Sequence, residues 1–214
     1  MDASGARFTT HLSRKRDVLI AVGDPGPLHR ALERHLASIG AAEDPAALRI
    51  LEDALSAVAL YMVSRPRFDS IGWTIHLEEP LRNVFVAGAA EEGSVVGRTF
   101  RDGVRRSAKN VFYAQTSRPA SKLQTSSVPV EGNDIFRIVE DPESKVLSEP
   151  AVALRWGCDA ARIAKFLAEI YKDGPDDLFR GDPFVEVECP RCARKHVIAG
   201  ERFDKELARG SAGG

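Results

Sequence analysis

The chain has 214 residues, of which 43% are hydrophobic and 29% are charged, a composition that excludes fibrous and wholly disordered proteins. Its net charge is −1, so the whole chain has no electrostatic attraction to nucleic acid or to a membrane surface. At roughly 150 residues per domain, we expect one full domain and a second, smaller one. The longest apolar run, at 54–63, is too short to cross a bilayer, and the N-terminal region lacks the pattern of a signal peptide. We therefore expect a cytoplasmic protein.

The first third of the chain predicts two strands and two helices. Short apolar runs at 7–12 and 17–22 are typical of strands, and leucines at helical spacing predict a helix over 28–39. Asp44 followed by proline is typical of a helix start, and the apolar stripe behind it predicts a buried central helix over 45–63.

The middle of the chain predicts an antiparallel sheet. Apolar and polar residues alternate from 70 to 99, a pattern that indicates a meander with one buried face. Two more strands are expected at 110–115 and 126–130, and Asn133 can cap a helix that runs toward Leu147.

The last fifty residues differ from the rest because they contain all three cysteines and few residues for a core. A short amphipathic helix is predicted over 160–170, and strands at 184–188 and 195–198 flank a Cys-Pro-Arg-Cys turn. The predicted organisation is a flexible tail (1–6), a core domain (7–150), a short linker (151–157), a zinc-binding domain (158–202) and a second flexible tail (203–214).

Cys189 and Cys192 are spaced as in a zinc knuckle, in which a hairpin turn directs two sulfurs at one ion. Cys158, at a helix start, is the predicted third ligand. The fourth is His196, Asp159, a water molecule or a group from another chain, because zinc prefers four ligands. The alternative to a metal site is three buried cysteines that act only as small hydrophobic residues. A thioredoxin-type redox pair is less compatible with a hairpin, because that motif follows a strand and opens a helix. Nearby cations favour the thiolate forms: Arg191, Arg194 and Lys195.

A second candidate site is the basic segment 98–122, which has a local charge of +6 and interleaved aromatic residues. Such a segment can bind an acidic partner or, less readily, nucleic acid, although a solvated loop and strand edge has the same composition. Its cations are Arg98, Arg101, Arg105, Arg106, Lys109, Arg118 and Lys122. The sequence contains no nucleophile motif, phosphate-binding glycine loop or pair of catalytic carboxylates, so we do not expect an enzyme.

Taken in chain order, the predicted strands, helices and cysteine-bearing hairpin resemble those of the bacterial 33 kDa chaperonins. Members of that family are redox-regulated holdases with a C-terminal zinc-thiolate switch. The resemblance extends from the strand that begins at Arg7-Phe8, through the helix at 48–63 and the strands at 71–90, to the region 126–149. The segment 153–198 is similar to the zinc module of that family: a cysteine, an amphipathic helix, an acidic loop, Glu-Val-Glu-Cys-x-x-Cys and a returning strand.

Two departures from the family are visible. The first ligand pair of the family is Cys-x-Cys, and here Trp156 occupies the position of its first cysteine. The family also has a long helical linker before its zinc module, whereas only 151–157 separate Pro150 from Cys158.

The resemblance implies an α+β fold, an antiparallel sheet packed with helices plus a small zinc-knuckle domain, with Cys158, Cys189 and Cys192 as zinc ligands. It implies a holdase for unfolding proteins in which oxidation joins Cys189 to Cys192 and releases zinc. The alternative is an adaptor or structural subunit that keeps the fold and the zinc and docks a partner through segment 98–122. A dimer is compatible with either function.

Overall fold

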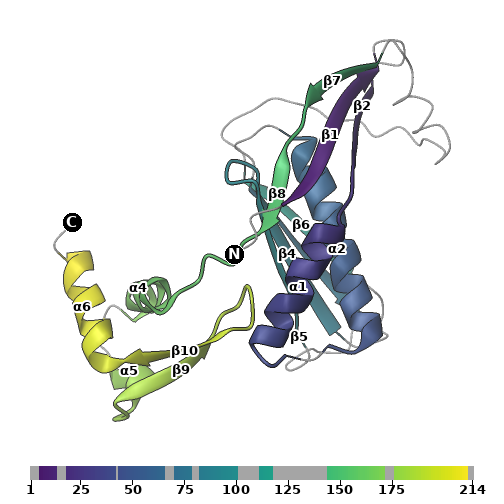
Figure 1. Cartoon of the computed structure of the whole chain (residues 1–214). Helices are drawn as coiled ribbons and strands as arrows, with labels where there is room; N and C mark the ends of the chain where they lie inside the picture. The colour runs from purple at the N-terminus through teal and green to yellow at the C-terminus, as the bar shows by residue number, and fades with distance from the viewer. Residues whose placement is uncertain are drawn as a thin grey trace. The chain divides into compact units, whose positions relative to one another are not determined.

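The structure is a computed structural model that describes residues 5–13, 18–41, 43–65, 70–78, 82–100, 111–117, 144–171 and 176–211. The chain divides into two compact units, Met1–Arg155 and Trp156–Gly214 (Figure 1). Among the described residues, no helix is both long and apolar enough to span a membrane.

The first unit is built on one sheet whose strand order is β2-β1-β8-β5-β4-β3-β6, with β7 also paired to β1. Its described pairings are antiparallel except for β5 with β8, which is parallel. The strands are β1 (Ala6–Ser13), β2 (Val18–Gly23), β3 (Ser70–Leu77), β4 (Arg82–Ala89), β5 (Ser94–Phe100), β6 (Val111–Ser117), β7 (Ser144–Ser148) and β8 (Ala151–Leu154).

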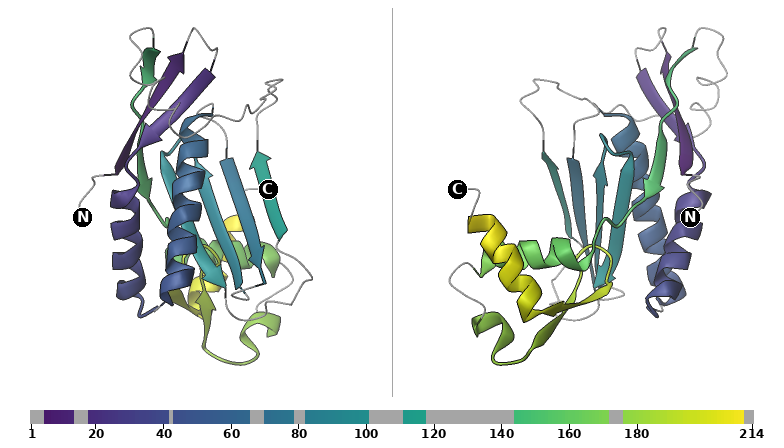
Figure 2. Two further views of the ribbon diagram at one scale, coloured as in Figure 1. Left: turned by 90° about the vertical axis from the view of Figure 1, so that its right-hand side faces the viewer. Right: turned by 60° about the vertical axis from the view of Figure 1, so that its left-hand side comes forward.

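Two helices, α1 (Gly26–Ser38) and α2 (Pro45–Val63), lie side by side against one face of this sheet (Figure 2). Asp44 begins α2 as predicted, because its carboxylate accepts a hydrogen bond from the Ala47 N–H at 2.9 Å. The apolar stripe of α2 is fully buried at Leu51, Leu55 and Val58. Burial of each such side chain contributes about 1.5–3 kcal/mol, so this layer is the main core of the first unit.

A partly buried ion cluster fixes the start of α2 to the sheet. Arg82, at the first position of β4, donates hydrogen bonds to Glu43 at 2.7 Å and to Asp44 at 2.5 Å. Thr99 of β5 donates its hydroxyl to the other oxygen of Glu43. The loop before α2 is therefore tied to two neighbouring strands.

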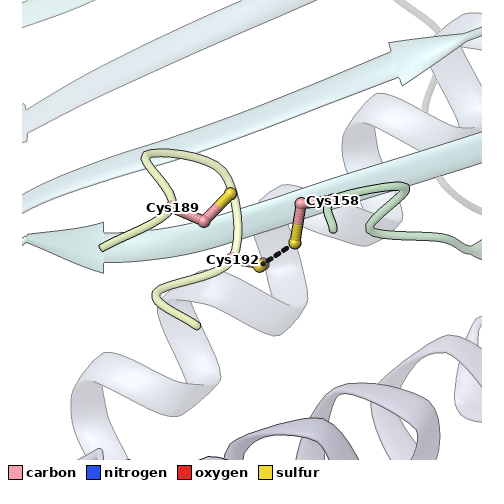
Figure 3. Close-up of side chains that lie close together, drawn as sticks. All are labelled: Cys158, Cys189 and Cys192. Atoms are coloured by element: carbon pink, nitrogen blue, oxygen red, sulfur yellow. Dashed lines mark hydrogen bonds between the residues drawn. The ribbon is translucent and has the colours of Figure 1, made fainter. Parts of the chain in front are cut away.

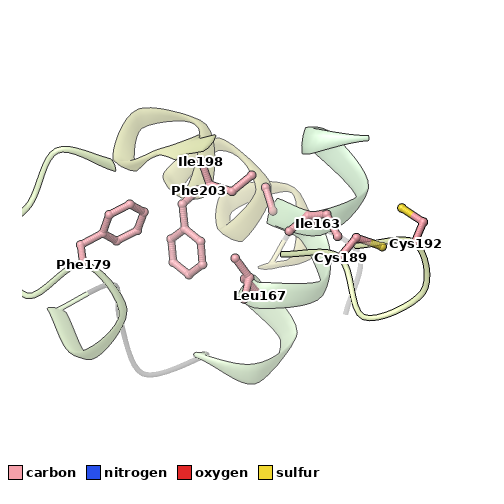
Figure 4. Close-up of a cluster of buried hydrophobic side chains, with 8 residues drawn as sticks. Ile163, Leu167, Phe179, Cys189, Cys192, Ile198 and Phe203 are labelled. Carbon is pink, nitrogen blue, oxygen red and sulfur yellow. The ribbon is translucent and has the colours of Figure 1, made fainter. Parts of the chain in front are cut away.

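The second unit has a separate core. It contains α4 (Ala160–Ile170), α5 (Asp176–Phe179), the hairpin β9 (Phe184–Glu188) with β10 (Lys195–Ala199), and α6 (Gly200–Ser211). The rings of Phe179 and Phe203 meet edge to face, with centroids 5.6 Å apart (Figure 4). The buried cluster consists of Ile163, Ala164, Leu167, Phe179, Cys189, Cys192, Ile198 and Phe203.

The α+β fold class, the capped helix at 45–63, the meander and the cysteine-bearing hairpin are confirmed. The strand predicted at 126–130 and the start of the helix predicted from Asn133 lie outside the described residues.

Four details of the predicted organisation were wrong. The helix expected to reach Leu147 is instead strand β7 at 144–148, because this segment pairs with β1. The linker expected at 151–157 begins as strand β8, in which Val152 is buried between β1 and β5. The expected N-terminal tail 1–6 ends in Ala6, which is buried in β1. The C-terminal tail expected at 203–214 is helical to Ser211, because Phe203 is buried in the core of the second unit.

Candidate metal centre

The turn between β9 and β10 holds two of the three cysteines. The Cys189 N–H donates to the Arg194 carbonyl at 2.8 Å, and the Ala193 N–H donates to the Cys189 carbonyl at 3.0 Å. Ala193 has a φ of 61°, a left-handed conformation that L-residues other than glycine adopt at a cost. The left-handed backbone at Ala193 and these two hydrogen bonds close the Cys-x-x-C segment into a tight loop. Both cysteines of this loop are buried.

Cys158 reaches the same place from the start of α4. Asp159 caps this helix by accepting the Arg162 N–H at 2.8 Å. Gly157 has a φ of 56°, and its carbonyl accepts a hydrogen bond from the Arg162 guanidinium at 3.0 Å. These local contacts bend the chain at Gly157 and direct Cys158 toward the hairpin turn.

The three sulfurs form one group in the structure (Figure 3). All three Sγ atoms lie within 4.8 Å of one another, and those of Cys158 and Cys192 are 3.0 Å apart. No disulfide joins the three cysteines, and Cys158 is less buried than the other two. The fold therefore brings together residues that are 31 and 34 positions apart in sequence.

The three thiols differ in acidity. The pKa of Cys189 is lowered to about 5, chiefly because the Cys192 thiol donates a hydrogen bond to the Cys189 sulfur. The same hydrogen bond and burial raise the pKa of Cys192. Burial is the main cause of a raised pKa at Cys158. Cys189 is therefore the most acidic of the three thiols.

This donor set suits a soft divalent ion such as zinc. At a Zn–S distance of about 2.3 Å, neighbouring sulfurs of a tetrahedral site lie about 3.8 Å apart. The separations between the Sγ atoms, which are at most 4.8 Å, therefore differ from that spacing by about 1 Å or less. Cys158, Cys189 and Cys192 would hold the ion, and its binding would displace the remaining thiol protons.

The structure does not bring His196 into the group of three sulfurs. The His196 side chain lies on the inner side of β10, 8% exposed, and its Nε2 atom is buried without a hydrogen-bond partner in the described part of the chain. His196 is paired with Val187, and Cys189 follows Val187 by two residues. The side chains of His196 and Cys189 therefore lie on the same face of the hairpin. Asp159, the other sequence candidate for a fourth ligand, uses its carboxylate as the helix cap.

Only part of the predicted basic segment falls among the described residues. Arg98 lies on β5, where its guanidinium stacks over the Phe100 ring at 4.2 Å from the centroid. The other six cations of the segment lie outside the described residues: Arg101, Arg105, Arg106, Lys109, Arg118 and Lys122.

Sequence reasoning missed the residues that shape the cysteine group. Arg162 holds the Gly157 carbonyl, and Ala193 adopts the left-handed conformation that completes the turn. Gly157 directly before Cys158 was the one signal available in the sequence, because a glycine beside a ligand is typical of a sharp bend.

Comparison with known proteins gives a structural match and no sequence match. No protein-family model matches the chain, and no curated protein sequence matches it. Its structure is similar to the crystal structure of the 33 kDa chaperonin (heat shock protein 33 homolog) of Thermotoga maritima, with a TM-score of 0.62 and 13% identity. The match covers 97% of this chain and 99% of that chain. The chain therefore has the fold of the 33 kDa chaperonin, with three clustered cysteines in its C-terminal unit.

Proposed function

We propose that this chain is a divergent, redox-regulated holdase chaperone whose C-terminal unit binds zinc through Cys158, Cys189 and Cys192. One combined observation supports the proposal: the chain has the fold of the 33 kDa chaperonin over 97% of its length, and its three cysteines form one group. Under this proposal the described second unit is a metal-stabilised sensor, and the chain holds unfolding client proteins on apolar surface.

The proposed redox step consumes one molecule of hydrogen peroxide. A thiolate attacks a peroxide oxygen to form a sulfenic acid with loss of hydroxide, and a second thiol then displaces water from the sulfenic sulfur. Two thiols are thereby oxidised to a disulfide, and the peroxide is reduced to two waters. Loss of two of its ligands releases the metal.

The Cys189–Cys192 pair is the disulfide that the family resemblance implies. Cys192 also lies 3.0 Å from Cys158, so a Cys158–Cys192 bridge competes with it. Because Trp156 replaces one cysteine of the family pattern, each chain forms at most one intramolecular disulfide. The cysteine left over becomes sulfenylated or joins two chains.

An aggregation assay tests this function. Peroxide-treated protein should suppress the thermal aggregation of an unfolding client more strongly than reduced protein, and metal analysis should find about one zinc per chain in the reduced form only. Cys192→Ser removes the sulfur shared by both candidate bridges, so its activity should not respond to peroxide. If neither the reduced nor the oxidised wild-type protein suppressed aggregation, the proposal would be excluded.

The alternative function, an adaptor that docks an acidic partner through segment 98–122, is favoured by one observation. Seven cations stand in this segment with a single acidic residue, Asp102. Reversal of Arg105 and Arg106 to Glu should then abolish a salt-sensitive interaction in lysate pull-downs while leaving the melting temperature unchanged. Identical pull-downs at low salt would exclude the adaptor.

A further inference from the structure

Strand β6 is an end of the sheet formed by the described strands. It pairs residue by residue with β3, from Ser70 opposite Ser117 to His76 opposite Val111. Among the strands that the structure describes, β6 has no neighbour on its other side. The backbone N–H and C=O groups along that edge can therefore accept another strand.

The side chains of β6 are exposed on both faces of the sheet. Phe112 is 56% exposed and lies on the helix-facing side, where its ring meets Trp73 at a centroid distance of 5.5 Å. Tyr113 is 61% exposed and lies on the opposite side, because successive residues of a strand alternate. Ala114 and Gln115 are also exposed. An aromatic ring is thus available on each side of the open edge.

This strand lacks two of the residue types by which proteins protect sheet edges. Its sequence, Val-Phe-Tyr-Ala-Gln-Thr-Ser, contains no charged residue and no proline. The strand at the other end of the sheet, β2, differs because only Leu19 and Gly23 are exposed on it. Among the described strands, the end strand that carries exposed aromatic side chains is therefore β6.

We propose that the β6 edge binds an extended, apolar polypeptide segment by strand addition. Hydrogen bonds to the backbone recognise an extended chain of any sequence, and Phe112 with Trp73 and Tyr113 accept its alternating apolar side chains. A folded protein hides both features and an unfolding one exposes both. The inference rests on the proposed chaperone function and assigns the client surface to β6.

The sequence around β6 argues against a second copy of this chain as the occupant. Lys109 precedes the strand by two residues, and Arg118 follows it directly. Antiparallel pairing of two β6 strands joins the start of one to the end of the other, so like charges would come together. A neutral or acidic extended segment meets no such repulsion.

A peptide-binding experiment on the full chain, after peroxide treatment, tests the inference. The probe is a short fluorescein-labelled peptide of alternating valine and threonine, compared by anisotropy with the same peptide N-methylated at every residue. Full N-methylation removes the donors of both peptide edges and should weaken binding by about tenfold or more. Tyr113→Ser should weaken binding of the unmodified peptide by about fivefold. Val146→Ser is the matched control, because Val146 is 55% exposed on β7, and it should bind like wild type.

Each outcome decides the inference. Equal binding of the methylated peptide, or equal weakening by Val146→Ser, would overturn it. A concentration-dependent dimer that Tyr113→Ser dissociates would show instead that β6 joins two copies. Loss of peptide binding in a protein that still suppresses aggregation would refute the β6 site and leave the proposed function standing. Absence of both activities would refute the proposed function itself.

Discussion

The two units of this chain are stabilised in different ways. The first unit has a broad aliphatic core in which two helices cover a sheet, with fully buried side chains such as Leu55 and Val86. The second has a buried cluster of eight residues, two of which are cysteines whose sulfurs belong to the candidate metal centre. Units this small bury little apolar surface and often gain stability from a cross-link or a metal. We therefore expect the folding of the second unit to depend on its cysteines.

Metal removal should produce the largest difference between the units. Structural zinc contributes on the order of 10 kcal/mol to small modules, so a chelator should unfold the second unit and leave the first intact. Hydrogen exchange read by mass spectrometry should show loss of protection across roughly 158–200, with protection retained in α2. Peroxide treatment should give the same pattern.

Two results would contradict this difference between the units. Loss of protection in α2 would show that the cores unfold together, and unchanged protection in the second unit would show that its apolar cluster suffices. Cys189→Ser is the matched variant, because it removes one ligand without a chelator. It should reproduce the effect in the reduced protein.

Truncation of one buried side chain in each unit should come next in size. Phe203→Ala should destabilise the second unit by about 3–5 kcal/mol, and Leu55→Ala the first by about 2–5 kcal/mol. Each variant should lower only the melting transition of its own unit, observed by circular dichroism together with hydrogen exchange. An unchanged melting temperature of the second unit in Phe203→Ala would support the flexible tail that the sequence predicts for 203–214.

The parts of the fold that were predictable from sequence have strong local patterns. The helix at 45–63 has a capping aspartate, a proline at its first position and an unbroken apolar stripe, and the structure places it within those bounds. The alternation from 70 to 99 gave the meander, and the Cys-x-x-C spacing gave the hairpin turn.

The parts that were not predictable depend on distant segments. Strands β7 and β8 are held by β1 and β5, which are remote in sequence, so 144–154 carries little local evidence of a strand. Among the described side chains of helix α6, the buried one is Phe203. Sequence spacing also suggested His196 as a fourth ligand, and the structure places it on the same face of the hairpin as Cys189 but outside the group of three sulfurs.

Disruption of the ion cluster at Arg82 should lower stability by a smaller amount, and only in the first unit. Arg82→Met leaves Glu43, whose side chain is 10% exposed, without its cation. Removal of one partner of a buried pair costs about 3 kcal/mol or more, and denaturant melts should show this loss in the first unit alone. A second change, Glu43→Gln, should recover part of the loss because it removes the uncompensated charge. No recovery would assign the effect to lost packing of the arginine stem.

The smallest effect should come from the two helix caps, which form a matched pair across the units. Asp44 caps α2, and Asp159 caps α4 beside Cys158. Replacement of either by alanine should destabilise its unit by about 1 kcal/mol, with a further loss at Asp44 because that carboxylate also pairs with Arg82.

The caps differ in their effect on metal affinity, because metal binding is coupled to folding in the second unit only. Asp159→Ala should weaken zinc binding by about fivefold in competition with a chromogenic chelator, the factor that corresponds to a loss of about 1 kcal/mol. Asp159→Asn keeps the capping oxygen and should bind zinc like wild type, which separates the cap from any role of the carboxylate as a ligand. Asp44→Ala should leave zinc affinity unchanged. Equal weakening by Asp44→Ala and Asp159→Ala would mean that the two units are thermodynamically coupled, and that the metal stabilises the whole chain rather than its small C-terminal core.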